Sequence, residues 1–263
     1  MIHKTIWITG ASSGIGEALA LHYAQPGVAL ILSARRFDEL KRVATLCEAK
    51  GAKAFILPLD LADISNPKGL VNTAMACTGK IDILINNGGV SQRALAADTS
   101  MEVVRKIMEV NFFGQVALSS ALLPEFIKAG GGQFAVLSSF TGKFGFAWRS
   151  AYAASKHALH GYFESLAIEN HAHHVHVTLI CPGRIKTNIS LHSINADGSV
   201  YGKMDEGQLK GMEADACAAI IAKAIARKKR EISIGKTDKL LLHIHRFFPA
   251  LFFKIALKLD PRK

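Results

Sequence analysis

Cysteine is scarce in this sequence, and its spacing is uninformative. The four cysteines among 263 residues are Cys47, Cys77, Cys181 and Cys217, and none forms C-x-x-C or another ligand spacing. We interpret them as reduced thiols in a reducing compartment, not as a disulfide framework or a zinc site. Four histidines crowd residues 171–177, but no nearby cysteine or well-spaced carboxylate completes a ligand set, so we expect no metal.

Long apolar stretches are missing at the start of the sequence and around Pro249. The N-terminal residues MIHKTIWITG contain no apolar leader or cleavage site, so we expect a cytoplasmic protein that is not secreted. Around Pro249 the longest stretch without a charged residue is 247–253, far short of the roughly 20 residues that span a bilayer. Low-complexity linkers and internal repeats are also absent, which favours a single domain.

Acidic residues are few only near the C-terminus. Residues 223–263 contain 12 Lys and Arg against three Asp and Glu, whereas residues 1–222 contain 20 and 18. Of the net charge of +11, residues 223–263 therefore carry +9 and the rest of the chain +2. No nucleic-acid-binding motif accompanies this excess, so we expect no DNA or RNA partner.

Apolar, β-rich runs alternate with longer helical patterns along the chain. The predicted strands are 5–9, 29–33, 54–58, 82–86, 134–138, 175–180 and 231–234, and the predicted helices are 17–25, 38–50, 68–78, 101–128 in two pieces, 151–171 and 213–229. Strands that are apolar throughout are typical of a parallel sheet covered on both faces. The pattern predicts one doubly wound α/β domain over residues 1–236 and an extension over 237–263.

A glycine-rich turn, TGASSGIG, follows the first predicted strand. Gly10, Gly14 and Gly16 provide backbone without side chains where a pyrophosphate approaches. The next helix offers free N–H groups and its positive dipole end to that anion. The spacing is G-x-x-x-G-x-G, without the G-K-[ST] of Walker-type loops, and its place on the first βα connection predicts a nucleotide site.

No acidic residue ends the second predicted strand, where an NAD site places Asp or Glu on the ribose 2′-hydroxyl. The strand ends instead in LSARRF, with Arg35 and Arg36. A guanidinium pairs with the 2′-phosphate of NADP, which a carboxylate repels. These residues favour NADP(H) over NAD(H), and the alternative is a solvated arginine pair at a strand end.

Residues 150–156 place Tyr152 and Lys156 one helical turn apart among alanines and serines. Taken alone, this spacing fits a tyrosine packed in a core with a lysine in solvent. A polar, glycine-punctuated segment, 188–212, follows a predicted strand end. Because such loops border the ligand crevice of α/β sheets, it is a candidate lid, with an ordinary surface loop as the alternative.

Together these motifs resemble the short-chain dehydrogenase/reductase family over nearly the whole chain. The matching segments are TGASSGIG (9–16), NNGG (86–89), LSS (137–139), YAASK (152–156) and PGRIKT (182–187). Gly88 stands where the family usually has alanine, and Asn111 matches its fourth catalytic position. The resemblance implies a Rossmann-like, seven-stranded parallel sheet with helices on both faces.

The resemblance also implies catalytic roles. Tyr152 is the general acid/base that protonates a carbonyl oxygen, and Lys156 favours its ionised form and so lowers its pKa. Ser139 would hold the substrate oxygen, with Ser138 as the rival for that role. Asn111 would anchor a water that links Lys156 to solvent.

Cofactor contacts carry over from the resemblance as well. The implied positions are Gly10, Ser12, Ser13, Gly14, Ile15, Gly16, Arg35, Arg36, Asp60, Leu61, Asn87, Tyr152, Lys156, Pro182, Gly183, Ile185 and Thr187. Asp60 has a local alternative, because it would also serve as the cap of the following helix.

The segment between Ser139 and Tyr152 is rich in aromatic residues. Its aromatics are Phe140, Phe144, Phe146 and Trp148. They favour an apolar ketone, aldehyde or alcohol as substrate, and packing beneath the loop or at a subunit contact is the alternative.

Leucines and phenylalanines alternate with basic residues in the tail, residues 237–263. This pattern predicts an amphipathic helix pair bent at Pro249 that lies at a membrane interface. It resembles the C-terminal extension of membrane-associated steroid- or retinoid-type family members. The alternative is a dimer interface that buries the same face.

The sequence thus predicts an NADP(H)-dependent oxidoreductase acting on a lipophilic carbonyl or secondary alcohol such as a steroid, retinoid or long-chain carbonyl. The family resemblance implies a homodimer or homotetramer. An NADPH-binding scaffold or redox sensor with little turnover is the alternative, and the complete set of four catalytic positions disfavours it.

Overall fold

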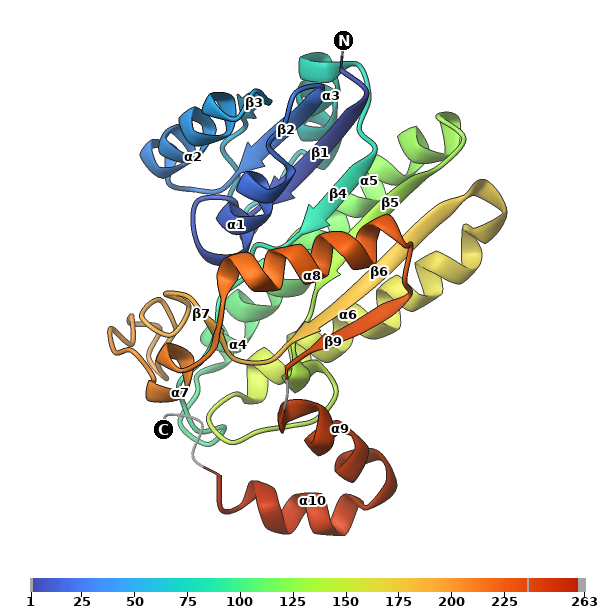
Figure 1. Cartoon of the computed structure of the whole chain (residues 1–263). Helices are drawn as coiled ribbons and strands as arrows, with labels where there is room; N and C mark the ends of the chain where they lie inside the picture. The colour runs from blue at the N-terminus through green and yellow to red at the C-terminus, as the bar shows by residue number, and fades with distance from the viewer. Residues whose placement is uncertain (1, 236, 260–263) are drawn as a thin grey trace.

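The computed structural model describes residues 2–235 and 237–259. In this part of the chain, seven parallel strands form one sheet in the order β3-β2-β1-β4-β5-β6-β9 (Figure 1). Its strands are β1 Lys4–Thr9, β2 Val28–Ser33, β3 Lys53–Ile56, β4 Ile83–Asn86, β5 Gly132–Leu137, β6 Val175–Pro182 and β9 Glu231–Ile234. The predicted doubly wound fold is confirmed.

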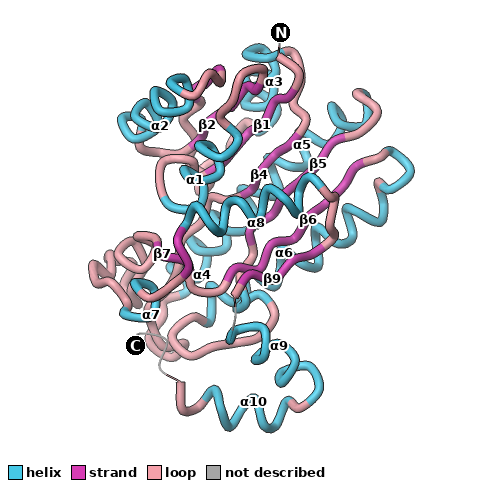
Figure 2. Tube along the Cα trace, in the orientation of Figure 1, coloured by secondary structure: helices cyan, strands magenta, loops and turns pink. Residues whose placement is uncertain are grey.

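Helices cover both faces of the sheet (Figure 2). They are α1 Gly14–Tyr23, α2 Phe37–Ala49, α3 Pro67–Thr78, α4 Met101–Met108, α5 Gly114–Lys128, α6 Ser150–Glu169 and α8 Ala214–Ala226. One apolar core joins α1, α2 and α8 to the sheet, and a second joins α3, α5 and α6 to its other face. Ile6 and Ile8 of β1 belong to the first core and Trp7 to the second, because successive strand side chains point to opposite faces.

The strand order reverses direction between β1 and β4. In open α/β sheets, the crevice outside the carboxyl ends of the strands at such a point is where ligands bind. The glycine-rich turn before α1 and the segment after β4 both lie at this edge.

The predicted helix over 101–128 forms in two pieces, α4 and α5, joined by a π-helical turn, η1 Glu109–Phe113. Among the described residues, this is the one helix long and apolar enough to cross a membrane. Leu118, Leu122 and Phe126 on its inner side are fully buried in the second core. Burial against the sheet therefore accounts for its apolar composition.

The segment 188–212 is built into the fold. Two-residue strands, β7 Ile185–Lys186 and β8 Met212–Glu213, pair across its base, and a short helix, α7 Glu206–Leu209, lies between them. Ile194 accepts a hydrogen bond from the Arg93 amide (2.9 Å) and donates one to the Ser91 carbonyl (2.9 Å). These bonds tie the segment to the loop that follows β4.

The tail forms two helices, α9 Thr237–Phe247 and α10 Pro249–Ala256, which meet at Pro249 as predicted (Figure 1). Phe252 of α10, 7% exposed, packs with Phe140 and Phe144. These three rings form a small core separate from the two on the sheet, and burying Phe252 contributes about 2 kcal/mol to docking of the tail. The neighbouring Phe253 points away and is 64% exposed.

Candidate active site

A cavity of about 340 Å³ opens at the carboxyl ends of β1, β2 and β4. The turn between β1 and α1 forms one wall, with Gly10 at φ 64° and Gly14 at φ 61°, a left-handed conformation that glycine adopts without strain. At Gly16 a Cβ atom would lie 2.2 Å from the carbonyl oxygen of Gly10, so only glycine lets the helix start so close to the turn. The amide end of α1 therefore faces the cavity at close range.

Asn87 holds this turn in place. Its Nδ2 donates hydrogen bonds to the carbonyl oxygens of Thr9 (3.0 Å) and Gly10 (3.1 Å). At Gly88 a Cβ atom would lie 2.5 Å from Leu61 Cδ1. Leu61 thus occupies the space that the methyl group of the family's usual alanine would need, which explains glycine at position 88.

Two guanidinium groups stand at the β2 side of the cavity. Arg35 and Arg36 both line it, and both are exposed. Arg36 Nη2 donates to Ser12 Oγ (3.2 Å) and Ser13 Oγ (2.9 Å). The Arg36 guanidinium is thus in contact with the glycine-rich turn. Together with Arg35, it provides donors that fit an additional phosphate on the adenosine ribose.

Asp60 and Leu61 also line this cavity. Asp60 Oδ1 accepts a hydrogen bond from the Ala62 amide (3.0 Å). The next helix begins at Pro67 and is capped by the side chain of Asn66 instead. The alternative of Asp60 as a helix cap is therefore wrong.

A second, smaller cavity of about 120 Å³ adjoins the first. The two share five lining residues, among them Ile15, Asn87 and Thr187. The second also brings together Ser139, Tyr152, Lys156, Pro182, Gly183 and Ile185. Of the predicted catalytic set, three members therefore meet beside the nucleotide-type cleft.

Helix α6 carries Tyr152 and Lys156 on one buried face, at 6% and 4% exposure. The helix begins under Gln92, whose Oε1 accepts hydrogen bonds from the amides of Ala151 (2.8 Å) and Tyr152 (3.2 Å). A buried glutamine from the loop after β4 thus satisfies the first-turn donors and fixes where Tyr152 sits.

Lys156 reaches the end of β5. Its Nζ donates to the carbonyl oxygen of Leu137 (2.7 Å). Burial lowers the pKa of Lys156 to about 8. A Cβ on Gly89 would lie 3.6 Å from this Nζ and 3.0 Å from Asn111 Oδ1, so both groups face the same glycine.

Asn111 lies within the π-helical turn and is fully buried. Its Oδ1 accepts from the Val90 amide (2.8 Å), while its Nδ2 donates to the Val90 carbonyl (2.9 Å) and to Ser155 Oγ (3.0 Å). The side chain thus ties the loop after β4 to α6. Such π turns often mark functional sites.

The two candidate serines have different partners. Ser139 Oγ accepts from the Thr141 amide (3.2 Å) and from Thr141 Oγ1 (3.0 Å), and its interaction with Tyr152 lowers the pKa of the tyrosine. Ser138 turns away from Tyr152: its Oγ donates to the carbonyl of Lys156 (3.1 Å) and contacts His160 Nε2 (2.9 Å). The structure therefore places Ser139, the residue selected from the family spacing, beside the tyrosine.

The electrostatic environment of Tyr152 differs from the prediction. Burial raises the pKa of Tyr152, and the largest opposing effect is the positive charge of Arg149. Interactions with Ser139 and Arg93 oppose it further. Lys156, which the sequence predicts for this role, has its Nζ 5.8 Å from the centroid of the tyrosine ring. In the protein alone, Arg149 is the larger influence.

Arg149 belongs to a buried charged cluster that the sequence did not reveal. Arg93 and Asp205 form a buried ion pair, with Arg93 Nε 3.0 Å from Asp205 Oδ2. Arg149 Nη2 lies 3.7 Å from the same carboxylate, and burial lowers its pKa to about 10. These residues are separated by up to 112 positions, so no local pattern predicted their meeting.

The aromatic segment before Tyr152 is not the substrate wall that the sequence suggests. Phe140 and Phe144 are buried in the small core under the tail, with Phe146 packed against it. None of the aromatics from 140 to 148 is among the described residues that line the second cavity. The alternative of packing beneath the loop is correct for Phe140 and Phe144.

His160 follows Lys156 by one turn on α6. Burial lowers the pKa of His160 to about 4, so the ring is neutral at neutral pH. The reaction as predicted has no role for it.

Comparisons with known proteins agree with this geometry. A family model described as short chain dehydrogenase matches residues 4–197. A relative from Drosophila melanogaster, named dehydrogenase/reductase SDR family protein 7-like, is 41% identical over 260 residues, which cover 97% of this chain and 80% of the relative.

Two solved structures are similar over most of the chain. A short-chain dehydrogenase from Streptomyces avermitilis has a TM-score of 0.82 at 28% identity and covers 98% of both chains. An alcohol dehydrogenase from the archaeon Thermococcus sibiricus, complexed with 5-hydroxy-NADP, has a TM-score of 0.75 at 27% identity and covers 88% of this chain and 95% of its own. The chain therefore belongs to the short-chain dehydrogenase/reductase family, whose members are oxidoreductases that bind a nicotinamide cofactor.

Proposed function

We propose that this protein is an NADP(H)-dependent oxidoreductase that interconverts a lipophilic carbonyl compound and its secondary alcohol. The observation that carries the proposal is the meeting of Ser139, Tyr152 and Lys156 in one cavity beside a glycine-rich nucleotide cleft. When bound, the nicotinamide supplies or accepts the hydride.

Tyr152 moves the proton in this proposal. Its hydroxyl donates a proton to the substrate oxygen during reduction and takes it back during oxidation. Ser139, which lines the same cavity as Tyr152, donates a hydrogen bond to the same oxygen as negative charge develops there. Tyr152 is only 6% exposed, which limits the access of bulk water to its hydroxyl.

Lys156 and Asn111 serve as the proton supply. With a pKa near 8, the Lys156 ammonium exchanges its proton close to neutral pH more readily than an ordinary lysine. Asn111 shares the pocket at Gly89 with Lys156 and is assigned the water that connects this lysine to solvent. Lys156 is also assigned to the ribose of the cofactor.

Arg149 is a positioning residue in this scheme. Its guanidinium lines the small cavity and opposes the rise in the pKa of Tyr152. The buried Arg93–Asp205 pair holds it in place. In this scheme Lys156 keeps its assigned roles at the ribose and in the proton supply, while Arg149 takes the electrostatic effect on Tyr152 that the sequence assigns to Lys156.

The preference for NADP(H) rests on Arg35 and Arg36. Among the described residues of the larger cavity, the one carboxylate is Asp60, whose Oδ1 already accepts a backbone hydrogen bond. No acid competes for the 2′ position, and a phosphate there would be paired by guanidinium groups. The remaining predicted cofactor positions line one or both cavities or form the glycine-rich turn itself.

The smaller cavity has a mixed lining, and its apolar residues Leu137 and Ile189 beside the polar catalytic set are what supports a lipophilic substrate. The exposed apolar side of the tail supports the same assignment, since a peripheral membrane position would give access to such substrates. Burial of the tail in a homodimer or homotetramer is the competing assignment.

The test is NADPH oxidation with a panel of steroid, retinoid and long-chain carbonyls. We expect turnover with NADPH, at least tenfold weaker kcat/KM with NADH, and a loss of at least 100-fold in Tyr152→Phe. Arg42→Gln, at a surface ion pair with Glu17 and Glu39, is the control and retains activity. Stoichiometric NADPH binding without turnover on any carbonyl would favour the scaffold or redox-sensor alternative.

A further inference from the structure

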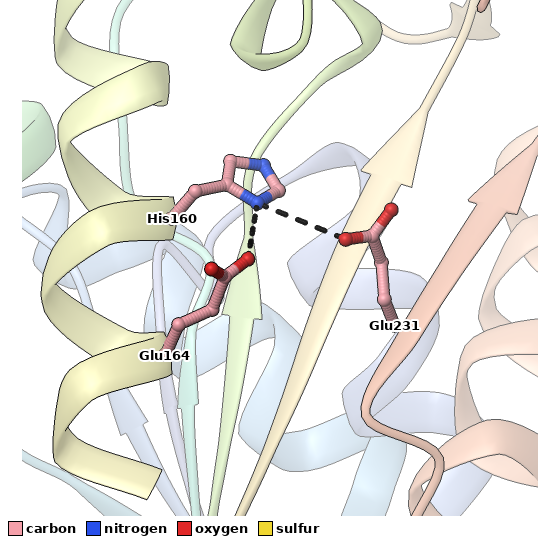
Figure 3. A group of neighbouring side chains, drawn as sticks. All are labelled: His160, Glu164 and Glu231. Carbon is pink, nitrogen blue, oxygen red and sulfur yellow. Dashed lines mark ion pairs between the residues drawn. The ribbon is translucent and has the colours of Figure 1, made fainter. Parts of the chain in front are cut away.

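Three side chains outside the catalytic cavity converge between α6 and β9 (Figure 3). His160 and Glu164 lie one turn apart on α6, and Glu231 is the first residue of β9. His160 Nδ1 lies 3.6 Å from Glu164 Oε1 and 3.9 Å from Glu231 Oε2. All three atoms lie within 4.8 Å of one another.

The hydrogen bonds of His160 decide which ring nitrogen carries the proton. Ser138 Oγ gives its proton to the Lys156 carbonyl, so it accepts from His160 Nε2 at 2.9 Å. In the neutral ring, Nδ1 then carries a lone pair. His160 is only 8% exposed, and its Nδ1 is buried without a hydrogen-bond partner.

Of these three electron-rich atoms, Glu231 Oε2 already accepts a hydrogen bond from Lys143 Nζ (2.6 Å), whereas the buried His160 Nδ1 has no donor. A buried lone pair beside two carboxylate oxygens favours a cation among the three. Around a tetrahedral Zn²⁺ with bonds of about 2.0–2.1 Å, ligand atoms are about 3.4 Å apart. The two separations from Nδ1, 3.6 and 3.9 Å, are wider than this by 0.2 and 0.5 Å, and the carboxylate oxygens lie within 4.8 Å of each other, so side-chain rotations would have to draw the three together.

We propose that His160, Glu164 and Glu231 form a divalent-cation site, with Zn²⁺ as the preferred ion. One imidazole and two carboxylates suit zinc better than Mg²⁺ or Ca²⁺, which take oxygen ligands. The Nε2–H bond to Ser138 is the outer contact that ligating histidines usually make. Solvent reaches the site because Glu164 is exposed.

Lys143 competes with the ion. Its Nζ lies 2.6 Å from Glu231 Oε2, the oxygen that faces His160. An ion at the site would displace this ammonium or share the oxygen with it. Removal of Lys143 therefore strengthens the proposed binding, whereas a mere ion pair between Lys143 and Glu231 predicts no such gain.

The site also connects to the catalytic region. Ser138 joins His160 to the backbone of Lys156, and Ser138 precedes Ser139 in the chain. A bound ion would tie α6 to β9 directly behind this segment. Its role is structural support of the catalytic wall, separate from the hydride-transfer reaction.

The experiment is calorimetric titration of Zn²⁺ into the chelator-treated full chain, with thermal unfolding as a second readout. We expect one ion per chain and a higher unfolding midpoint with Zn²⁺. His160→Gln and the surface variant Glu164→Gln should each weaken binding at least tenfold, and Lys143→Met should strengthen it several-fold. Mg²⁺ at the same concentration should produce no shift.

The matched control is His157→Gln, on the same helix, whose ring Nδ1 contacts the Ala153 carbonyl (2.8 Å). It should bind Zn²⁺ like the unmodified chain. Equal Zn²⁺ affinity in Glu164→Gln and the unmodified chain would overturn the proposal. So would binding that disappears when the histidines of 171–177 are replaced. Both readouts are independent of NADPH turnover, so failure of the oxidoreductase proposal leaves this test intact.

Discussion

At the scale of single residues, the site is dominated by charge held in buried positions. Lys156 and Arg149 are cations with lowered pKa values, and Tyr152 is an acid with a raised one. In each case burial is the largest cause, because the charged form loses its hydration. These residues therefore cost the folded protein stability while they equip it for proton transfer.

The Lys156→Met variant should be more stable than the unmodified protein at pH 7. The folded pKa of Lys156 is about 8, below the ordinary 10.5, so the unfolded chain binds more protons between these values. Lys156 therefore costs no stability above about pH 10.5, and its destabilising effect grows as pH drops from there toward 8. Removing the ammonium should raise the free energy of unfolding at pH 7 by about 1–2 kcal/mol, after the lost hydrogen bond to Leu137 is subtracted.

Urea unfolding of both proteins without cofactor, at pH 7 and pH 9.5, checks this prediction. The advantage of the variant should shrink at the higher pH, where the buried lysine is mostly neutral. A variant that is less stable at pH 7, or an advantage independent of pH, would contradict it.

The Arg149→Gln variant should shift the pH profile of catalysis. Loss of this charge raises the pKa of Tyr152 further, so the ionised tyrosine needed for alcohol oxidation forms at higher pH. We expect the acidic limb of kcat/KM for oxidation to move up by about one pH unit.

Arg149→Lys keeps the positive charge and should restore most of the original profile. A structural role alone would lower kcat/KM without moving the limb. Identical profiles in Arg149→Gln and the unmodified enzyme would refute the assignment of Arg149.

At the scale of elements, small residues and buried polar side chains decide how closely segments approach. Gly16 lets α1 begin against the turn that holds the nucleotide cleft. Gln92 sets the start of α6, and Asn111 ties the π-helical turn to that helix. In the sequence, each of these residues indicates only local structure. Its effect on the site becomes visible only in the contact between two elements of the fold.

The helix α10 has a buried inner face and an exposed outer face, and substitution of the neighbouring residues Phe252 and Phe253 tests each face separately. Phe252 lies on the inner face and is buried, whereas Phe253 is exposed beside the basic Lys254. If the outer face lies on a membrane, Phe253→Ser should weaken binding to vesicles containing anionic lipid several-fold, because it removes apolar area from the interface. Flotation with such vesicles measures the effect.

The control is Phe252→Leu, which keeps the inner packing apolar and should bind vesicles normally. If Phe253→Ser leaves vesicle binding unchanged but converts an oligomer to a smaller species in light scattering, the tail is a subunit interface. Deletion of residues 237–263 should give the same result as Phe253→Ser, in larger degree.

At the scale of the whole molecule, the strand order places every predicted motif at one edge of the sheet. The turn after β1, the loops after β4 and β5, and the end of β6 lie at their carboxyl ends. Segments as far apart in sequence as Thr9 and Gln208 then line two adjoining cavities. The segment 188–212 is bonded to the loop after β4, and the tail packs against Phe140 and Phe144.

The sequence by itself determined the alternation of strands and helices, the glycine-rich turn and the spacing of Tyr152 and Lys156. These features are local, because periodicity, backbone freedom and one-turn spacing act over a few residues. They suffice for the seven-stranded fold and for placing Tyr152 and Lys156 on one face of a helix.

Only the tertiary structure decided which charges surround Tyr152 and where the aromatics before it go. Arg93, Asp205 and Arg149 meet through long-range packing, and Phe144 packs with Phe252 of the tail and not in the cavity. The energies of such contacts depend on burial and on distances between residues far apart in the chain. Local sequence patterns carry no information on either quantity.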